Sequence, residues 1–357
     1  MDRKQLLSRF VATPSLSGEE APLAQVICAV LDDLGVEYFL RDGNVICCLD
    51  NGADKALIFN AHMDTVAPGD SWSSDPYTLT ERKGRYYGLG VSDEQISLVL
   101  MLELVEELLG GVYETDFWFC FVINEEVDGL GSRLFAEYFA ESTSYQEAAC
   151  VLMEPTNNSF MELGKKGNYF GKLTARGAAT HSSRPDTGVN AVSLLLDAFT
   201  RLEEFVSSLQ EVDERLGSTT LACPTTISGG TSVNVVPDQA SATFDIRTIP
   251  QTHQQVLDAL PQLLQGLPVE LSAFATPAAP SLTSRDERIV SLFVEQGVTD
   301  IRYSSGSDDS TFFTAIGVPC VVFGAGNKEC IHQADEYIDI ANIEPAFRRY
   351  VSVAKSF

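Results

Sequence analysis

The chain has 357 residues, 45% of them hydrophobic and 21% charged, which is typical of a globular protein with one large or two ordinary domains. Fifty acidic and 24 basic residues give a net charge of −26 at pH 7, which argues against nucleic acid as a partner and requires local cations for any anionic substrate. No apolar run approaches the length of a membrane span, and the eight cysteines lie mostly in apolar runs, which favours free thiols and a cytoplasmic location.

The first 168 residues alternate strand-like apolar runs with helix-like patterns, as expected for α/β layers. The predicted strands are 45–49, 56–60, 117–123 and 149–153. Residues 94–109 predict a largely buried helix that stops at Gly110.

A different pattern runs from about residue 169 to 279. The predicted elements there are a half-exposed strand at 168–177, an amphipathic helix at 190–205, strands at 225–230 and 240–248, and a helix at 252–265. Strands with helices on one side predict a small α+β domain. A linker at 275–281 precedes the strand 318–323 and a terminal helix at 343–356, which resume the first pattern. We therefore predict an α/β, mixed-sheet domain formed by 1–168 and 280–357, with a smaller α+β domain, 169–279, inserted into it.

Histidine is scarce, since only four are present. His62 follows a predicted strand, and Asp64 lies two residues further on, on the same face of an extended backbone. Asp64 could therefore accept the second ring N–H of His62 and fix the tautomer that a metal needs. A histidine whose hydrogen bonds are satisfied inside the core is an equally good interpretation of this motif alone.

Acidic residues follow several of the other strands. Glu125 and Glu126 end the 117–123 run, and Glu154 ends the 149–153 run just before Pro155. Asp93 precedes the 94–109 helix, where a plain N-cap is the simpler interpretation. Taken together with His62 and with His332, which follows a fifth strand, these carboxylates would repel one another unless cations neutralised them. The set suits a pair of divalent metal ions.

The motifs resemble those of the M20 family of co-catalytic zinc peptidases and deacylases, especially its acetylornithine deacetylase and succinyl-diaminopimelate desuccinylase branches. The matching segments are H-M-D-T-V (62–66), G-L-G-V-S-D (88–93), N-E-E-V-D-G-L-G-S (124–132), E-P-T (154–156), H-S-S-R-P-D-T-G-V-N-A (181–191), N-V-V-P-D (234–238), F-D-I-R (244–247) and F-G-A-G…H (323–332). They span almost the whole chain in the family's order, which makes the resemblance specific.

The resemblance implies two zinc ions, with cobalt or manganese as alternatives for the same ligands. His62 and Glu154 would bind one ion, Glu126 and His332 the other, and Asp93 would bridge them.

Asp64 would support His62 within this arrangement. Glu125 would be the general base that activates a metal-bridging water and the acid that protonates the leaving amine. The inserted domain would be the family's lid and dimerisation domain, from which His181 stabilises the oxyanion, often across a homodimer.

Positions that hold substrate carboxylates in the family correspond to Arg247, Asn234, Lys165 and Lys166. A guanidinium suits that purpose because it can bind a carboxylate with two hydrogen bonds. For the two lysines and for Arg184, solvated surface charge remains an equal alternative.

Two segments depart from the family pattern. Asp93-Glu94-Gln95-Ile96-Ser97 stands where Asp-Met-Lys-Gly-Gly is common, and the loop 304–310 matches the substrate loop only loosely. The predicted function is therefore a metal-dependent amidohydrolase acting on a small N-acyl amino acid, favouring N-acetyl- or N-succinyl-ornithine. The alternatives are a dipeptidase, an aminopeptidase or a succinyl-diaminopimelate desuccinylase on the same scaffold, and a non-catalytic, metal-stabilised binding protein.

Overall fold

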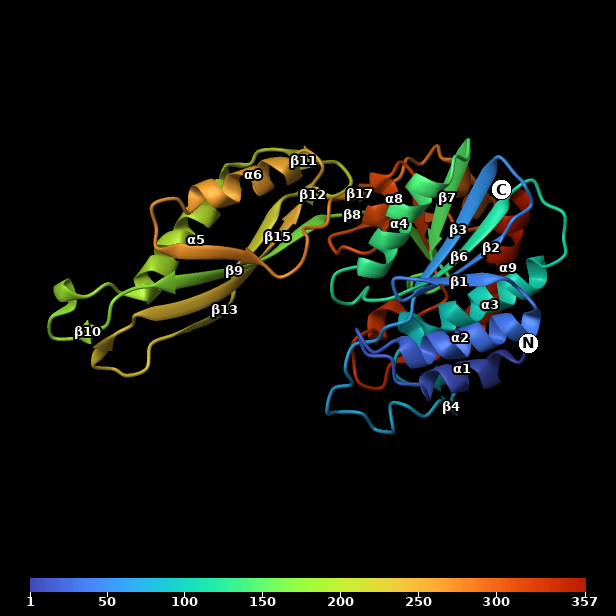
Figure 1. The fold of residues 1–357 in the computed structure, drawn as a ribbon, viewed down its shortest axis with the longest axis horizontal. Coiled ribbons are helices and arrows are strands. Elements are labelled where there is room, and N and C mark those ends of the chain that lie inside the picture. Colours follow the sequence, from blue (N-terminus) through green and yellow to red (C-terminus); the bar gives the residue numbers. More distant parts are fainter. The chain divides into compact units, whose positions relative to one another are not determined.

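Contacts between residues divide the 357 residues of this computed structural model into two units (Figure 1). Unit 1 consists of residues 1–163, 282–302 and 308–357, and unit 2 consists of residues 164–281 and 303–307. The boundaries between the two units lie within a few residues of the predicted limits at 168/169 and 279/280. The short segment 303–307 joins unit 2 in addition.

Unit 1 is built on a mixed sheet. In spatial order its strands are β1 (Tyr38–Arg41), β2 (Asn44–Leu49), β6 (Asp116–Val122), β3 (Lys55–His62), β7 (Glu147–Leu152), β19 (Cys320–Val322), β8 (Phe160–Lys165) and β17 (Ser281–Leu282), with β18 (Asp300–Ser304) paired to β8. The central strands β6, β3, β7 and β19 are parallel neighbours, whereas β1, β2 and β8 pair antiparallel. The predicted mixed α/β sheet is confirmed.

Helices cover both faces of this sheet. They are α1 (Arg3–Val11), α2 (Ala21–Leu34), α3 (Ile96–Leu108), α4 (Leu130–Ser142), α7 (Arg288–Glu295), α8 (Ser310–Ala315) and α9 (Ile340–Ser356). In β6 every residue is buried: Phe119 stacks on Phe59 toward one face, and Trp118 meets Phe139 of α4 on the other. Coverage on both faces explains why the sequence of β6 is a continuous apolar run rather than an alternating one.

A second, small sheet in unit 1 joins distant parts of the chain. Its strands are β4 (Thr80–Arg82), β5 (Arg85–Tyr87) and β20 (Tyr337–Asp339), with β5 in the middle. It ties the segment before Asp93 to the segment that follows His332. No helix of the chain is both long enough and apolar enough to cross a bilayer, and all eight cysteines are free thiols.

Unit 2 has a four-stranded antiparallel sheet with two helices. Along the chain its main elements are β9 (Gly167–Arg176), α5 (Ala191–Ser208), β13 (Thr220–Gly229), β15 (Gln239–Thr248), α6 (His253–Leu263) and β16 (Val269–Ala273). The spatial order β13-β15-β9-β16 and the β-α-β-β-α-β succession are those of a ferredoxin-like α+β fold. Two two-stranded sheets are added to it: β10 (Thr180–His181) with β14 (Val235–Val236), and β11 (Val212–Asp213) with β12 (Gly217–Ser218).

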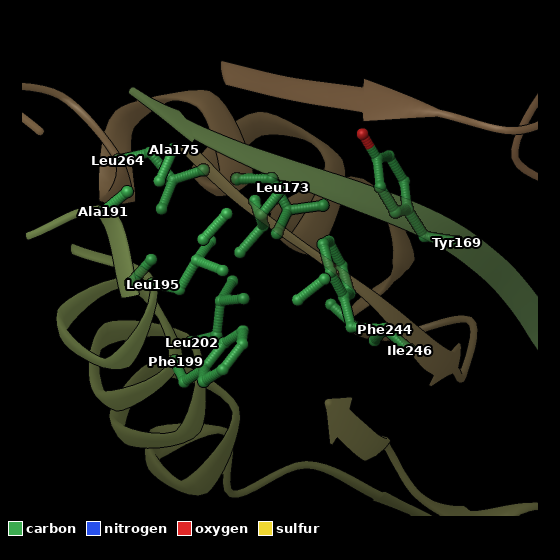
Figure 2. Packing of buried hydrophobic residues seen from close by; sticks show 14 of the residues in the cluster. Tyr169, Leu173, Ala175, Ala191, Leu195, Phe199, Leu202, Phe244, Ile246 and Leu264 are labelled. Carbon is green, nitrogen blue, oxygen red and sulfur yellow. The ribbon is translucent and has the colours of Figure 1, made fainter. Parts of the chain in front are cut away.

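The core of unit 2 lies between its sheet and its helices. Figure 2 shows Leu195 and Phe199 of α5 directed toward Leu173 and Phe244 of the strands. Phe244 also stacks on Tyr169, with ring centroids 5.8 Å apart. The apolar positions of α5 recur at helical spacing and face the sheet, which explains why an 18-residue helix forms there.

Candidate metal centre

The register of the parallel strands brings the predicted site residues to one edge of the sheet. His62 ends β3 level with Val122 of β6, and Asn60 is level with Leu152 of β7. Glu125 and Glu154 therefore leave their strands beside His62. This is the carboxyl edge, where open α/β sheets bind ligands.

The ring of His62 is held between a carbonyl and carboxylates. Its Nε2 lies 3.1 Å from Asp93 Oδ1 and 3.7 Å from Glu154 Oε1. Its Nδ1 lies 2.8 Å from the backbone carbonyl oxygen of Asp64 and 3.5 Å from the carboxylate oxygen Oδ1 of that residue. The closer acceptor for the Nδ1 proton is thus the carbonyl group of Asp64 rather than the carboxylate that the sequence suggested. Either acceptor leaves Nε2 facing the acids.

The carboxylate of Asp64 instead holds the glutamate pair. It accepts hydrogen bonds from the backbone N–H of Glu125 (3.0 Å) and Glu126 (3.1 Å), and from Ser17 Oγ (2.7 Å). Burial opposes ionisation of Asp64, but the adjacent His62 ring and the hydrogen bonds from Ser17 and Glu126 hold its pKa below the usual value. A charged acceptor for two successive amides fixes where both glutamate side chains begin.

Asp93 lies between the two histidines. Its Oδ1 faces His62, and its Oδ2 is 3.3 Å from His332 Nε2, which also lies 2.8 Å from Glu126 Oε1. Burial would raise the pKa of Asp93, but hydrogen bonds with His332 and His62 hold it well below its usual range. This is the position of a carboxylate that could bridge two ions.

Glu336 fixes the loop that carries Asp93. Its carboxylate accepts from the backbone N–H of Gly90 (2.9 Å), Ser92 (2.8 Å) and Asp93 (3.0 Å). Sequence analysis missed this residue. The only available indication was an acidic side chain four residues after His332.

Further carboxyl groups crowd the same region. Burial raises the pKa of Glu125 well above its ordinary value, and the charge of Asp309 raises it further. Burial raises the pKa of Glu94 to about 8 and that of Asp309 to about 7. Neither Glu94 nor Asp309 was singled out as a site residue from the sequence. Both belong to the segments that depart from the family pattern.

The donor set fits divalent metal ions. Ligand atoms of His62, Glu125 and Glu154 lie within 4.8 Å of one another, and so do those of His62, Asp93 and Glu126. Glu154 Oε1 is buried without a hydrogen-bond partner, and burial together with the charge of Glu94 raises the pKa of Glu154. A buried carboxylate is costly unless a proton or a cation compensates it. Imidazole and carboxylate ligands in this number suit zinc, cobalt or manganese.

Two of the predicted substrate residues are buried lysines of unit 2. Lys165 and Lys166 are 6% and 4% exposed, so solvated surface charge does not describe them. The Nζ of Lys166 donates to the carbonyl oxygen of Ser218 at 2.5 Å. Burial and the charge of Arg247 both lower the pKa of Lys166.

Arg247 lies close enough to Lys166 for their charges to interact. Its Nε donates to Asp245 Oδ2 at 3.0 Å, and its Nη1 donates to Ser307 Oγ at 3.3 Å. Asp245 thus pairs with Arg247, and Lys166 is a second cation close to Arg247.

His181 and Asn234 lie elsewhere in unit 2. His181 is exposed on β10, with its Nδ1 2.8 Å from Ser183 Oγ, and the carbonyl of Asn234 accepts from the backbone N–H of Ser182, just after that strand. They adjoin the Gln239 end of β15, whereas Arg247 is at the other end. Eight residues of strand separate these ends by about 27 Å. Within unit 2 the structure therefore does not bring His181 and Asn234 together with Arg247 and Lys166.

A mixed α/β sheet with two histidines and a carboxylate cluster at its parallel edge, in a chain with a second ferredoxin-like unit, defines a metal-dependent hydrolase of the two-metal peptidase class. The model of peptidase family M20/M25/M40 matches residues 58–356. The chain belongs to this family and is an M20 metallohydrolase.

Curated relatives match over nearly the whole chain. One is the probable succinyl-diaminopimelate desuccinylase of Staphylococcus aureus strain N315, 25% identical, with 99% of this chain and 96% of the relative covered. Another is the acetylornithine deacetylase of Aliivibrio salmonicida, 27% identical, with 96% and 95% covered. Among solved structures, an M20 family metallo-carboxypeptidase from Sulfolobus solfataricus superposes with a TM-score of 0.84 at 19% identity, with 99% of both chains covered. The last comparison establishes the fold.

Proposed function

We propose that this M20 metallohydrolase removes the acyl group from an N-acyl amino acid, with N-acetyl- and N-succinyl-ornithine as the foremost substrates. The observation that carries the proposal is the placement of Glu125 beside the His62–Glu154 donor group while Glu126 faces His332. One glutamate is thereby left to move protons at a site that can bind two ions. The similarity to relatives named acetylornithine deacetylase and succinyl-diaminopimelate desuccinylase supports the choice of reaction.

In this proposal His62, Asp93, Glu126, Glu154 and His332 hold two divalent ions. Zinc is the first candidate, with cobalt and manganese as alternatives. When bound, the ions supply Lewis-acid polarisation of the amide carbonyl and make a water acidic enough to attack it.

Glu125 accepts the proton from the attacking water and passes it to the leaving amine. Burial and the charge of Asp309 raise its pKa from the ordinary value, which is the direction that a general base requires. Water thereby adds across the C–N bond, and the products are a carboxylic acid and the free amine.

The buried cations of unit 2 support an anionic substrate. Arg247 can bind a carboxylate with two hydrogen bonds, and Lys166 adds a second positive charge beside it. Lys165 and Asn234 are proposed to complete substrate recognition, and His181 to stabilise the oxyanion. Because His181 lies about 27 Å from Arg247 along the unit 2 sheet, we propose that it serves the active site of a second copy in a cytoplasmic homodimer joined through unit 2.

A dipeptidase or carboxypeptidase is the rival on the same scaffold. The metal chemistry would be shared, and selectivity would come from the groups that hold the substrate's ends. The similarity of the fold to that of a metallo-carboxypeptidase supports including peptide substrates in the test. The rival from another class is a non-catalytic binding protein, against which the placement of Glu125 speaks.

The test is hydrolysis by the full chain loaded with zinc, cobalt or manganese. The substrates are N-acetyl-ornithine, N-succinyl-ornithine, N-succinyl-diaminopimelate and a dipeptide panel, with released amine as the measured product. We expect turnover of an ornithine derivative. Turnover of dipeptides alone would establish the rival, and no turnover with metal bound would contradict the proposed enzyme activity on these substrates.

A further inference from the structure

Glu94 is a buried carboxyl group that the proposed reaction does not use. It follows Asp93 directly, where the family commonly has methionine, and it is 1% exposed. The next residue, Gln95, stands where the family commonly has lysine. The two differences together make this part of the chain more negative by two charges than the common motif.

The side chain of Glu94 is directed to the His62 side of the metal centre. Its Oε1 accepts from the backbone N–H of His62 at 2.6 Å and lies 4.0 Å from His62 Nε2. Among the neighbouring charged groups, Glu94 has the largest effect on the pKa of Glu154. Glu94 thus borders both residues that are proposed to hold the first ion.

One oxygen of Glu94 has no partner. Oε2 is buried and makes no hydrogen bond. The hydrogen bond to His62 occupies only Oε1, so a purely structural role would leave the buried Oε2 without a hydrogen bond. A cation in reach of the carboxylate would compensate it.

We propose that Glu94 is an additional carboxylate ligand or close counter-charge of the ion held by His62 and Glu154, and that it shifts this position toward Mn²⁺ relative to Zn²⁺. The inference rests on the metal-ligand set of the proposed function. With Asp93 and Glu154, Glu94 makes three carboxylates against one imidazole. Carboxylate-rich ligand sets suit Mn²⁺, whereas zinc sites usually contain more nitrogen or sulfur ligands.

Metal binding tests the proposal without reference to any substrate. The full chain, Glu94→Gln and Glu94→Met are titrated with Mn²⁺ and with Zn²⁺ in chelator buffers, and bound metal is measured by mass spectrometry. Glutamine keeps an acceptor for the N–H of His62 and removes the charge, and methionine is the common family residue. Glu103→Gln is the matched control, because Glu103 is a partly buried acid on α3 that pairs with Arg3.

We expect both Glu94 variants to bind Mn²⁺ about tenfold or more weakly and to lose much less affinity for Zn²⁺, with Glu103→Gln unchanged. Thermal unfolding of each metal-free variant checks that it is folded. Mn²⁺ affinity of Glu94→Gln within about twofold of wild type would overturn the proposal and leave Glu94 as a structural acceptor. An equal loss for both ions would overturn the Mn²⁺ preference.

The result is separable from the proposed function. A wild-type chain that shows the Glu94-dependent preference but hydrolyses no substrate would refute the deacylase and leave this inference standing. An active deacylase whose Glu94 variants bind both ions like wild type would support the proposed function and refute this inference.

Discussion

At the scale of single residues, Asp64 explains how two glutamates can stand side by side at the end of a buried strand. Its carboxylate accepts the backbone N–H groups of both Glu125 and Glu126. The backbone is thereby fixed while the two side chains diverge, one toward His332 and one toward the His62–Glu154 group. The two adjacent glutamates can therefore serve the two separate roles proposed for them, because the main chain directs their side chains apart.

This division predicts different effects at the two positions. Glu125→Gln should keep its metal and lose about 10²–10⁴-fold in kcat, because only the proton-transfer group is removed. Metal analysis and kcat on the best substrate of the panel measure both effects, with the exposed acid Glu141→Gln on α4 as control. A kcat within tenfold of wild type would place the general base elsewhere.

His332 predicts a pH dependence of the metal-free protein. Hydrogen bonds to Asp93 and Glu126 raise its pKa from 6.5 to about 10. A raised folded-state pKa gives stability that is fully present below about pH 6.5 and is lost as the pH rises to about 10. Because the side chain is 48% exposed, solvent screening reduces the expected contribution to about 1–2 kcal/mol.

Urea unfolding with chelator at pH 6.5 and pH 10 measures the loss of stability in the wild type and in His332→Gln, in which the loss should be smaller by the contribution of His332. His253→Gln is the matched control, since burial lowers the pKa of His253 and no metal role is proposed for it. With metal bound the dependence should shrink, because the ion needs the neutral ring. Equal pH dependence in wild type and His332→Gln would show that the charged ring does not stabilise the fold.

At the scale of elements, the sequence predicts the strands of unit 1 well because their apolar runs are buried on both faces. The predicted run 117–123 is β6, Asp116–Val122, and the predicted helix 94–109 is α3, Ile96–Leu108. The strands of unit 2 are harder to predict from the sequence. The strand β16 is absent from the predicted elements because it is short, mostly exposed and carries little periodic signal. The α+β character of unit 2 was nevertheless predicted correctly.

The strand ends also predicted which candidate ligands lie together, because side chains at the carboxyl ends of neighbouring parallel strands meet at one edge of the sheet. What the sequence could not give were contacts between distant segments. Glu336 holds the amide of Asp93 from 243 positions away, and neither residue carries a local pattern that points to the other. The sequence also cannot show that His62 Nδ1 faces the backbone carbonyl oxygen of Asp64 (2.8 Å) rather than its carboxylate oxygen (3.5 Å), because the two distances differ by less than 1 Å.

The edge strand β13 leads to a prediction about assembly. Ile227 is 51% exposed and pairs with the buried Ala242, so it lies on the helix-covered face beside α5, where Leu196 is 54% exposed. An unpaired edge with neighbouring apolar side chains favours pairing with a second copy. Ile227→Lys should therefore convert the proposed dimer to a monomer, as measured by analytical ultracentrifugation.

Phe274→Lys is the matched control for this change. Phe274 is 63% exposed and directly follows β16, the opposite edge of the same sheet. Monomers produced by Phe274→Lys, with Ile227→Lys still dimeric, would assign the interface to the other edge. A monomeric wild type would refute the proposed dimer.

At the scale of the whole molecule, the net charge of −26 opposes the approach of an anion that Lys166 and Arg247 are proposed to bind. The long-range repulsion extends about 30 Å at 0.01 M salt and about 8 Å at 0.15 M, whereas direct contacts of buried groups are screened much less. Two substrates that differ only in acyl charge separate these effects. At neutral pH N-acetyl-ornithine carries no net charge, and N-succinyl-ornithine carries one negative charge.

We therefore expect the ratio of kcat/KM for N-succinyl-ornithine to that for N-acetyl-ornithine to rise about twofold or more between 0.01 and 0.15 M salt. Taking the ratio cancels any effect of salt on the metals or on the dimer, because both substrates use the same loaded enzyme. Lys166→Gln should lower kcat/KM for the succinyl substrate at every salt concentration and keep the rise, since it removes one of 24 basic residues and leaves the global field intact. A ratio that falls with salt would mean that the local cations, and not the net charge of the chain, govern the encounter with substrate.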